Sequence, residues 1–245
     1  MMKSISMRPR SNKTRVPKIA CFNRALTPLG VDLDLLISAM QKYVDECVAP
    51  VWGTPARLVK SRGFVKGAWA MVFLDGARVK DAQGYHDVTP DGLPMAKVFV
   101  KPILAAGDSV SVCASHELVE MLVDPAINMM TSGPDRHMIY SYESADPVEE
   151  VTFDVDGIPM SDFVYPACFE CFHKANSVRF DHSRKVRRPF EILAGVYQQV
   201  FKRGRWKEIF RSVGKAKRFA REDRRGHRTQ QRIKRTLWRS SKRLA

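Results

Sequence analysis

The sequence predicts an α+β domain followed by a basic, mainly helical C-terminal extension. Apolar patterns over residues 17–172 run in the order strand, helix, several strands, helix and hairpin, which is typical of α+β domains. Charge divides the chain near the same point, because residues 173–245 hold 24 Lys and Arg against 5 Asp and Glu. Residues 1–18 hold 6 basic and no acidic residues, so we expect a basic disordered arm over residues 1–16.

The first half of the domain is expected to combine three strands with one helix. Residues 16–22 form a candidate first strand, and residues 57–61 a second. The apolar run 69–74 ends at Asp75-Gly76, which predicts a buried strand followed by a turn. Residues 31–48 predict a helix because their apolar side chains recur at helical spacing, namely Leu35, Leu36, Met40, Val44 and Val48.

The second half is expected to hold a strand, a helix and a hairpin. Residues 97–101 predict a strand, and residues 109–123 predict a helix. The strands 151–155 and 158–165 flank Asp156-Gly157, which is typical of a hairpin turn. Beyond the domain, residues 189–219 begin with apolar residues at helical spacing and predict a helix, namely Phe190, Ile192, Leu193, Val196, Tyr197, Val200 and Phe201.

The helix expected at 109–123 carries the stretch S-H-E-L-V-E-M-L-V-D-P, residues 115–125. At about 100° per residue, His116, Glu117, Glu120 and Asp124 share one face, and the apolar residues occupy the other. One interpretation is the solvated face of an ordinary amphipathic helix. The other is a metal site, because His116 and Glu120 are spaced i and i+4, and Glu117 follows the histidine as the general base of a zinc protease does.

A catalytic zinc needs a third protein ligand, and the sequence offers two candidates. Asp124 follows on the same helix, but on a continuous helix it lies about 12 Å from His116 along the axis. Glu143, in the segment Y-E-S-A-D-P-V-E, is the better placed candidate because it returns from a second part of the chain. Asp146 is then expected to accept the free N–H of His116 and fix its tautomer, and Asp124 is the other residue expected to support the ligands.

The two motifs together resemble those of zincin-like proteins from bacteria and bacteriophages, with H-E-x-x-E-x-x-x-D-P and a later E-x-x-D. The pattern is also distantly similar to that of the plant exordium family. The resemblance covers roughly residues 17–172 and implies a mixed sheet with an active-site helix. It also implies a bound zinc, a peptide or protein substrate, and Glu117 as catalytic base. Strand 97–101 would then border the cleft and pair with an extended peptide.

The basic C-terminal region predicts non-specific contact with DNA or RNA, because dense Lys and Arg neutralise phosphates. Aromatic residues lie between the basic ones and could stack on bases. The alternative partner is an acidic protein surface, in a virion or in another copy of the chain. The residues expected to contact phosphates are Arg203, Arg205, Lys207, Arg218, Arg224, Arg225 and Arg235.

Two functions therefore remain open at the level of the sequence. The first is a zinc metallopeptidase with a nucleic-acid-contacting tail, such as a phage processing or virion-associated enzyme. The second is a non-catalytic virion-structural or nucleic-acid-binding protein that uses the same domain as a scaffold. No stretch approaches the roughly 20 apolar residues of a membrane span, and no signal peptide is recognisable, so we expect a cytoplasmic or virion location.

Overall fold

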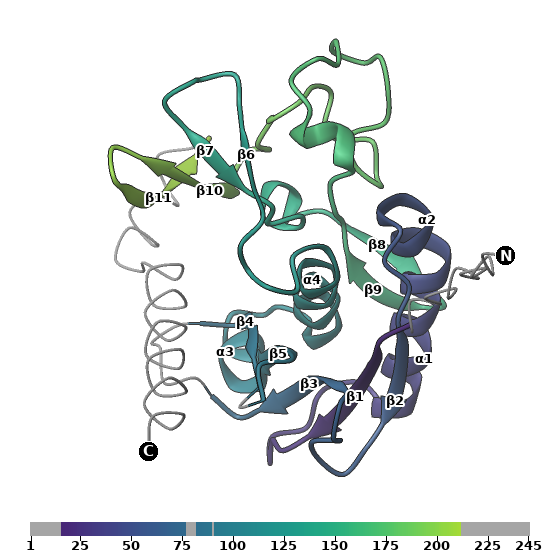
Figure 1. Cartoon of the computed structure of the whole chain (residues 1–245). Coiled ribbons are helices and arrows are strands. Elements are labelled where there is room, and N and C mark those ends of the chain that lie inside the picture. Colours follow the sequence, from purple (N-terminus) through teal and green to yellow (C-terminus); the bar gives the residue numbers. More distant parts are fainter. Residues whose placement is uncertain (1–15, 77–81, 90, 212–245) are drawn as a thin grey trace, which may run out of the picture.

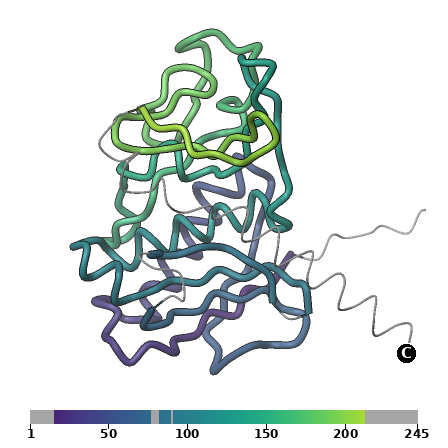
Figure 2. Tube along the Cα trace, turned by 90° about the vertical axis from the view of Figure 1, so that its left-hand side faces the viewer, coloured from purple at the N-terminus to yellow at the C-terminus, as the bar shows by residue number. Residues whose placement is uncertain are grey.

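A computed structural model describes residues 16–76, 82–89 and 91–211 and confirms the α+β class. Two layers are visible in Figures 1 and 2: a five-stranded sheet lies below, and residues 130–211 lie above. Helix α4 (Val110–Val123) lies between them (Figure 1). Residues 1–15 of the basic arm fall outside the described residues, as do four of the expected phosphate contacts, Arg218, Arg224, Arg225 and Arg235.

The five-stranded sheet has the order β2-β1-β3-β5-β4. Its strands are β1 (Lys18–Asn23), β2 (Arg57–Lys60), β3 (Trp69–Leu74), β4 (Gly84–Val88) and β5 (Pro94–Phe99). Neighbouring strands are parallel except for β4, which runs antiparallel to β5. The mixed sheet therefore has an antiparallel strand at one edge, and this is the strand nearest the candidate site.

The predicted helix over residues 31–48 is confirmed in two parts. Helix α1 spans Leu33–Lys42 and continues as a π-helical stretch, Tyr43–Val48, before the short α2 (Ala49–Trp52). The carboxylate of Asp32 caps α1 by accepting two backbone N–H groups of its first turn. Helix α3 (Val100–Ala105) follows β5 directly and leads into α4.

The main core lies on the face of the sheet that α1 and α4 cover. Side chains alternate along each strand, so every second residue of β1, β3 and β5 faces this core. These are Ile19, Cys21, Met71, Phe73, Ala96 and Val98. A smaller apolar cluster, with Phe22 and Val72, lies on the opposite face. Because α4 packs on β4 and β5, the polar side chains of its middle turns are enclosed.

The upper layer contains a second sheet and a hairpin. The sheet has the order β11-β10-β7-β6. Its strands are β6 (Met130–Ser132), β7 (Ile139–Ser141), β10 (Tyr197–Lys202) and β11 (Arg205–Phe210). The predicted hairpin is confirmed as β8 (Thr152–Val155) and β9 (Ile158–Ser161). Short 3₁₀ segments at Asp146–Val148 and Pro166–Phe169 complete this layer.

One prediction of secondary structure is wrong, and another is confirmed as a strand but is wrong about its place beside the cleft. The described part of 189–219 contains no helix but the strands β10 and β11, whose turn at Arg203-Gly204 has positive φ at both residues. Side chains on both faces of β10 are buried, so the spacing of its apolar residues resembles that of a helix. The strand expected at 97–101 is β5, which ends at Phe99 and lies inside the sheet. The strand that borders the cleft is β4, which the sequence patterns did not reveal.

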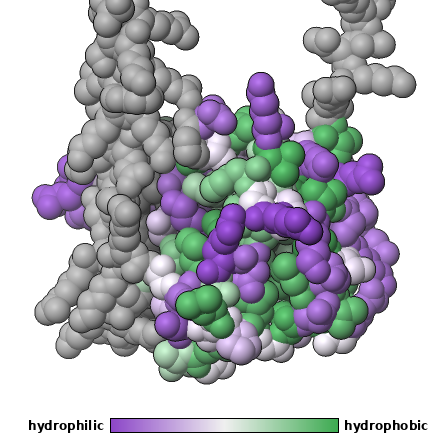
Figure 3. Space-filling model, turned by 90° about the horizontal axis from the view of Figure 1, so that it is seen from below, coloured by the Kyte–Doolittle hydropathy of each residue, from purple (hydrophilic) through white to green (hydrophobic). Residues whose placement is uncertain are grey.

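The face of the molecule shown in Figure 3 mixes hydrophilic and hydrophobic residues. Large exposed apolar side chains come from separate segments, for example Leu26, Phe64 and Phe172. Within the described ranges, none of the helices has both the length and the apolar character needed to cross a membrane.

Candidate metal centre

Helix α4 is fixed in its position by hydrogen bonds to the β8–β9 hairpin as well as by apolar packing. The Ser115 hydroxyl accepts the Ser161 N–H at 2.8 Å, and the Ser111 hydroxyl donates to the Pro159 carbonyl at 2.6 Å. Leu118 and Met121 are fully buried in the core. The orientation of the helix is thus set from two sides, which leaves its polar residues facing β4 and the segment that follows β7.

The interpretation of these polar residues as a solvated face is wrong. Glu117 is only 5% exposed and Glu120 only 3%. Burying a carboxylate costs several kcal/mol unless it is paired or binds a cation. The helix therefore keeps its acidic groups inside the protein, at a place where other charged side chains converge.

The first group of converging side chains consists of His116, Glu120 and Asp146. The Nε2 atom of His116 lies 3.5 Å from Glu120 Oε1 and 3.4 Å from Asp146 Oδ1. We expected Asp146 to face the other ring nitrogen, but it faces the same one as Glu120. The reason is local: Ala145 donates its N–H to Glu120 Oε1, which brings the following Asp146 against His116. The ligand atoms of these three residues lie within 4.8 Å of one another and are able to hold a metal ion.

A second group consists of His86, Glu120 and Glu143, whose ligand atoms also lie within 4.8 Å of one another. The Nδ1 atom of His86 lies 3.5 Å from Glu120 Oε2 and 3.8 Å from Glu117 Oε2. Glu143 is therefore brought to the site as expected, but beside His86 rather than beside His116. Sequence reasoning missed His86 because it missed its strand, β4.

Strand β4 approaches α4 closely because Gly84 has no side chain. A Cβ atom at this position would lie 2.8 Å from Glu117 Oε1 and 2.8 Å from Cys113 Sγ. Gly84 and His86 are two residues apart, so they face the same side of the strand. The absence of a side chain at Gly84 thus lets β4 lie close to α4, and this places His86 beside the carboxylates of α4.

Asp124, the other candidate third ligand and the second residue expected to support the ligands, lies away from both groups. It ends α4, and its two carboxylate oxygens accept the N–H groups of Asn128 and Met129 at 2.9 and 3.0 Å. The residue does not belong to the cavity wall. Pro125 ends the helix at this point, so the aspartate turns toward the loop that follows and stabilises it.

The carboxylates dominate the electrostatics of the site. Burial acts to lower the pKa of His116, but Glu120, Asp146 and Glu117 outweigh it and raise this pKa well above 6.5. Burial raises the pKa of Glu120 to about 8, and the nearby Asp146 and Glu143 carboxylates add to the rise. Without a cation the centre therefore retains protons near neutral pH, and metal binding would release them.

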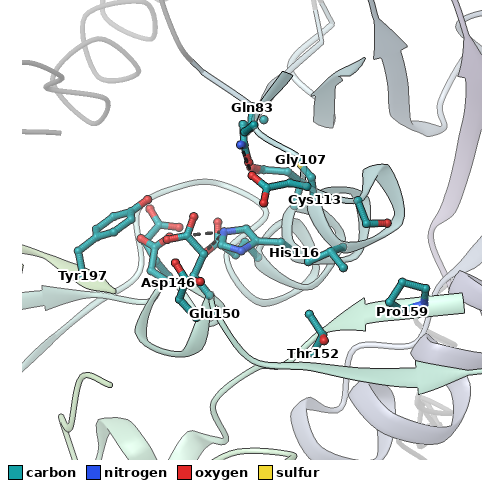
Figure 4. A pocket seen from close by; sticks show the side chains of 18 of the residues that line it. Gln83, Gly107, Cys113, His116, Asp146, Glu150, Thr152, Pro159 and Tyr197 are labelled. Atoms are coloured by element: carbon teal, nitrogen blue, oxygen red, sulfur yellow. Dashed lines mark hydrogen bonds and ion pairs between the residues drawn. The ribbon is translucent and has the colours of Figure 1, made fainter. Parts of the chain in front are cut away.

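The centre opens into a cavity of about 800 Å³. Figure 4 shows the His116 ring and the Asp146 carboxylate facing each other, with Gln83 and Gly107 on one side and Thr152 and Pro159 on the other. Residues from beyond 172 also contribute to the wall, since Tyr197 and Gln199 of β10 line it. Neither was recognised in the sequence, because only the pairing of β10 with β7 brings them here.

Three of the expected phosphate contacts lie within the described residues. Arg203 occupies the turn between β10 and β11, and Arg205 and Lys207 are on β11. All three are exposed. They form a small basic surface on one hairpin, separate from the residues that line the cavity.

Known proteins add no further information about the site. No protein-family model, no curated protein and no solved structure matches this chain.

Proposed function

We propose that this chain is a zinc-dependent metallopeptidase of the zincin type. One observation carries the proposal: His116, Glu117 and Glu120 lie on one helix, largely buried, at the wall of an open cavity. An amphipathic surface helix would leave such groups in water. Their burial beside Asp146 is instead the arrangement expected of a ligand set and an adjacent base.

The donor set fits a zinc ion. His116, Glu120 and Asp146 offer one imidazole nitrogen and two carboxylate oxygens, which are accepted zinc ligands. Glu117 belongs to neither of the two ligand groups. Its Oε2 atom is buried and makes no hydrogen bond with any other residue that the structure describes, and its contact with His86 Nδ1 is 3.8 Å long. Glu117 is thus available for proton transfer.

The proposed chemistry is peptide hydrolysis. A bound zinc ion would polarise the substrate carbonyl and make the attacking water more acidic. The Glu117 carboxylate accepts a proton from that water as the oxygen bonds to the carbonyl carbon. It then delivers the proton to the amide nitrogen as the carbon–nitrogen bond breaks. Strand β4 would pair with an extended substrate, because Gln83 and Gly84 line the cavity and β4 is at the edge of its sheet.

The substitution Glu117→Gln tests this function, because it removes the base and keeps the size of the side chain. We expect peptidase activity on a quenched peptide library to fall by about 10²–10⁴-fold. The zinc content, measured by elemental mass spectrometry, should stay unchanged. Glu46→Gln is the matched control, since Glu46 is exposed and outside the cavity. Equal activity of wild type and Glu117→Gln would refute catalysis and favour the scaffold function.

We also propose that the basic C-terminal region contacts nucleic acid, which the exposed hairpin residues Arg203, Arg205 and Lys207 favour. Binding of an arbitrary DNA or RNA duplex should weaken steeply between 50 and 200 mM salt, about one power of salt per neutralised phosphate. Replacing the three residues with Gln should lower the exponent of this salt dependence by about three. An unchanged salt dependence in the triple variant would contradict a role for the hairpin.

A further inference from the structure

The carboxylate of Glu120 has a separate histidine beside each of its oxygens. Oε1 lies 3.5 Å from His116 Nε2, and Oε2 lies 3.5 Å from His86 Nδ1. A carboxylate that ligates a single ion turns one or both oxygens toward that ion alone. A carboxylate whose two oxygens serve different partners has the geometry of a bridge between two ions.

Each end of this bridge has a further carboxylate. Asp146 completes the group around His116, and Glu143 completes the group around His86. The two groups have the same composition, one imidazole and two carboxylates, and share only Glu120. Their residues come from β4, from α4 and from the segment after β7. Two equivalent half-sites are therefore built around one residue from three different parts of the chain.

The balance of charge also favours two cations. Four carboxylates, Glu117, Glu120, Glu143 and Asp146, are each between 1% and 5% exposed. One divalent ion would neutralise two of these charges, and the other two would then need a retained proton or a protonated histidine to balance them. Burying an uncompensated charge costs several kcal/mol. Two divalent ions would balance all four while both histidines remain neutral ligands.

We propose that the centre binds two divalent metal ions bridged by Glu120, one on His116 and Asp146 and the other on His86 and Glu143. The second ion goes beyond the single zinc of the proposed peptidase, although both rest on the same centre. Mixed imidazole and carboxylate ligands suit Zn²⁺ and Mn²⁺. In proteins the ions of such pairs lie about 3.5–4 Å apart, a separation that one bridging carboxylate can span.

The test is the metal stoichiometry of the full chain. The protein is stripped with a chelator, dialysed and reloaded with Zn²⁺, and the bound metal is measured by elemental mass spectrometry. We expect two ions per chain for wild type and one for His86→Ala or His116→Ala. The matched control is His137→Ala, which should keep two ions because His137 is exposed and outside the cavity. Thermal denaturation establishes that each variant is folded.

Reloading wild type with Mn²⁺ gives a second measurement that needs no variant. Two bridged Mn²⁺ ions should give an exchange-coupled electron paramagnetic resonance spectrum, and isolated Mn²⁺ the simple six-line spectrum. One ion per chain with a six-line spectrum would overturn the proposal. If that single ion were lost in His116→Ala and activity depended on Glu117, the peptidase would stand without the second site. If no ion bound, both proposals would fail.

Discussion

The buried carboxyl of Asp162 lies beside that of Asp181, and both side chains are fully buried. The two oxygens of Asp181 accept the N–H groups of Lys185 and Val186, at 2.8 and 3.0 Å, whereas Asp162 accepts that of Ser183 at 3.1 Å. Burial raises the pKa of Asp162 from 3.8 to about 8, and the hydrogen bond with Asp181 contributes to the rise.

This pair predicts a pH-dependent stability. Because the folded protein holds the proton of Asp162 more tightly than the unfolded chain, the free energy of unfolding should fall as pH rises from about 4 to about 8. The slope is at most about 1.4 kcal/mol per pH unit. Asp162→Asn should remove this contribution, since its amide can donate to Asp181 at every pH. Denaturant unfolding at pH 5 and pH 8 measures the effect.

The gain in stability from Asp162→Asn should be larger at pH 8 than at pH 5. The exposed Asp45 provides the control, and Asp45→Asn should change stability equally little at both values. A loss of stability in Asp162→Asn at pH 8 would mean that the pair is not protonated as described.

At the level of single residues, the sequence predicted the part of the centre that lies on one helix. The spacing of His116, Glu117 and Glu120 depends only on helix geometry, so the motif was sufficient to predict that these side chains lie on one face. His86 could not be found in this way. It comes from a five-residue strand, Gly84–Val88, that has no regular apolar alternation. Its place beside Glu120 depends on the packing of β4 against α4, which no local pattern encodes.

At the level of elements, prediction failed for a strand whose two faces are both buried, because its apolar and polar residues do not alternate. Four consecutive residues of β10, Tyr197 to Val200, are buried, so the apolar positions do not alternate. The better signal was the dipeptide Arg203-Gly204, whose positive φ values fit a two-residue hairpin turn. By contrast, β3 was predicted with its correct ends because a compact apolar run is followed by Asp75-Gly76.

The contact between β4 and α4 gives a prediction for Gly84→Ala. The added methyl group would lie 2.8 Å from Glu117 Oε1 and 2.9 Å from Glu117 Cγ, so the strand or the side chain must move. We expect a loss of about 1–3 kcal/mol in stability, as for other overpacked sites. Metal affinity should fall as well, because His86 lies on the displaced strand. Calorimetric titration with Zn²⁺ and thermal denaturation measure the two effects.

A matched substitution separates the contact from the general effect of adding a methyl group. Gly76→Ala is suitable, since a Cβ atom there would meet no atom of the described residues within 4 Å. It should leave both stability and zinc affinity close to wild type. If Gly84→Ala behaved like Gly76→Ala, β4 would not be held against α4 as closely as described.

At the scale of the whole molecule, acidic side chains gather at the cavity. Seven acidic residues line the cavity, and among the described lining residues none is Lys or Arg. The acidic residues are Asp108, Glu117, Glu120, Glu143, Asp146, Glu149 and Glu150. Metal ions would balance the buried ones, whereas Asp108 and Glu150 are exposed and Glu149 is half-buried. These three leave a negative rim around the opening.

The negative rim predicts a preference for substrates with Lys or Arg near the cleaved bond, if the chain is a peptidase. An exposed ion pair contributes up to about 1 kcal/mol, which corresponds to about fivefold in kcat/KM. The double variant Asp108→Asn, Glu150→Gln should therefore lose up to about 25-fold on Lys-containing peptides and little on neutral ones. The loss should shrink as salt rises, because added ions screen exposed charges. Neither residue belongs to a ligand group, so zinc content should stay unchanged. An equal loss on basic and neutral peptides would show that the rim supports the fold of the site rather than its choice of substrate.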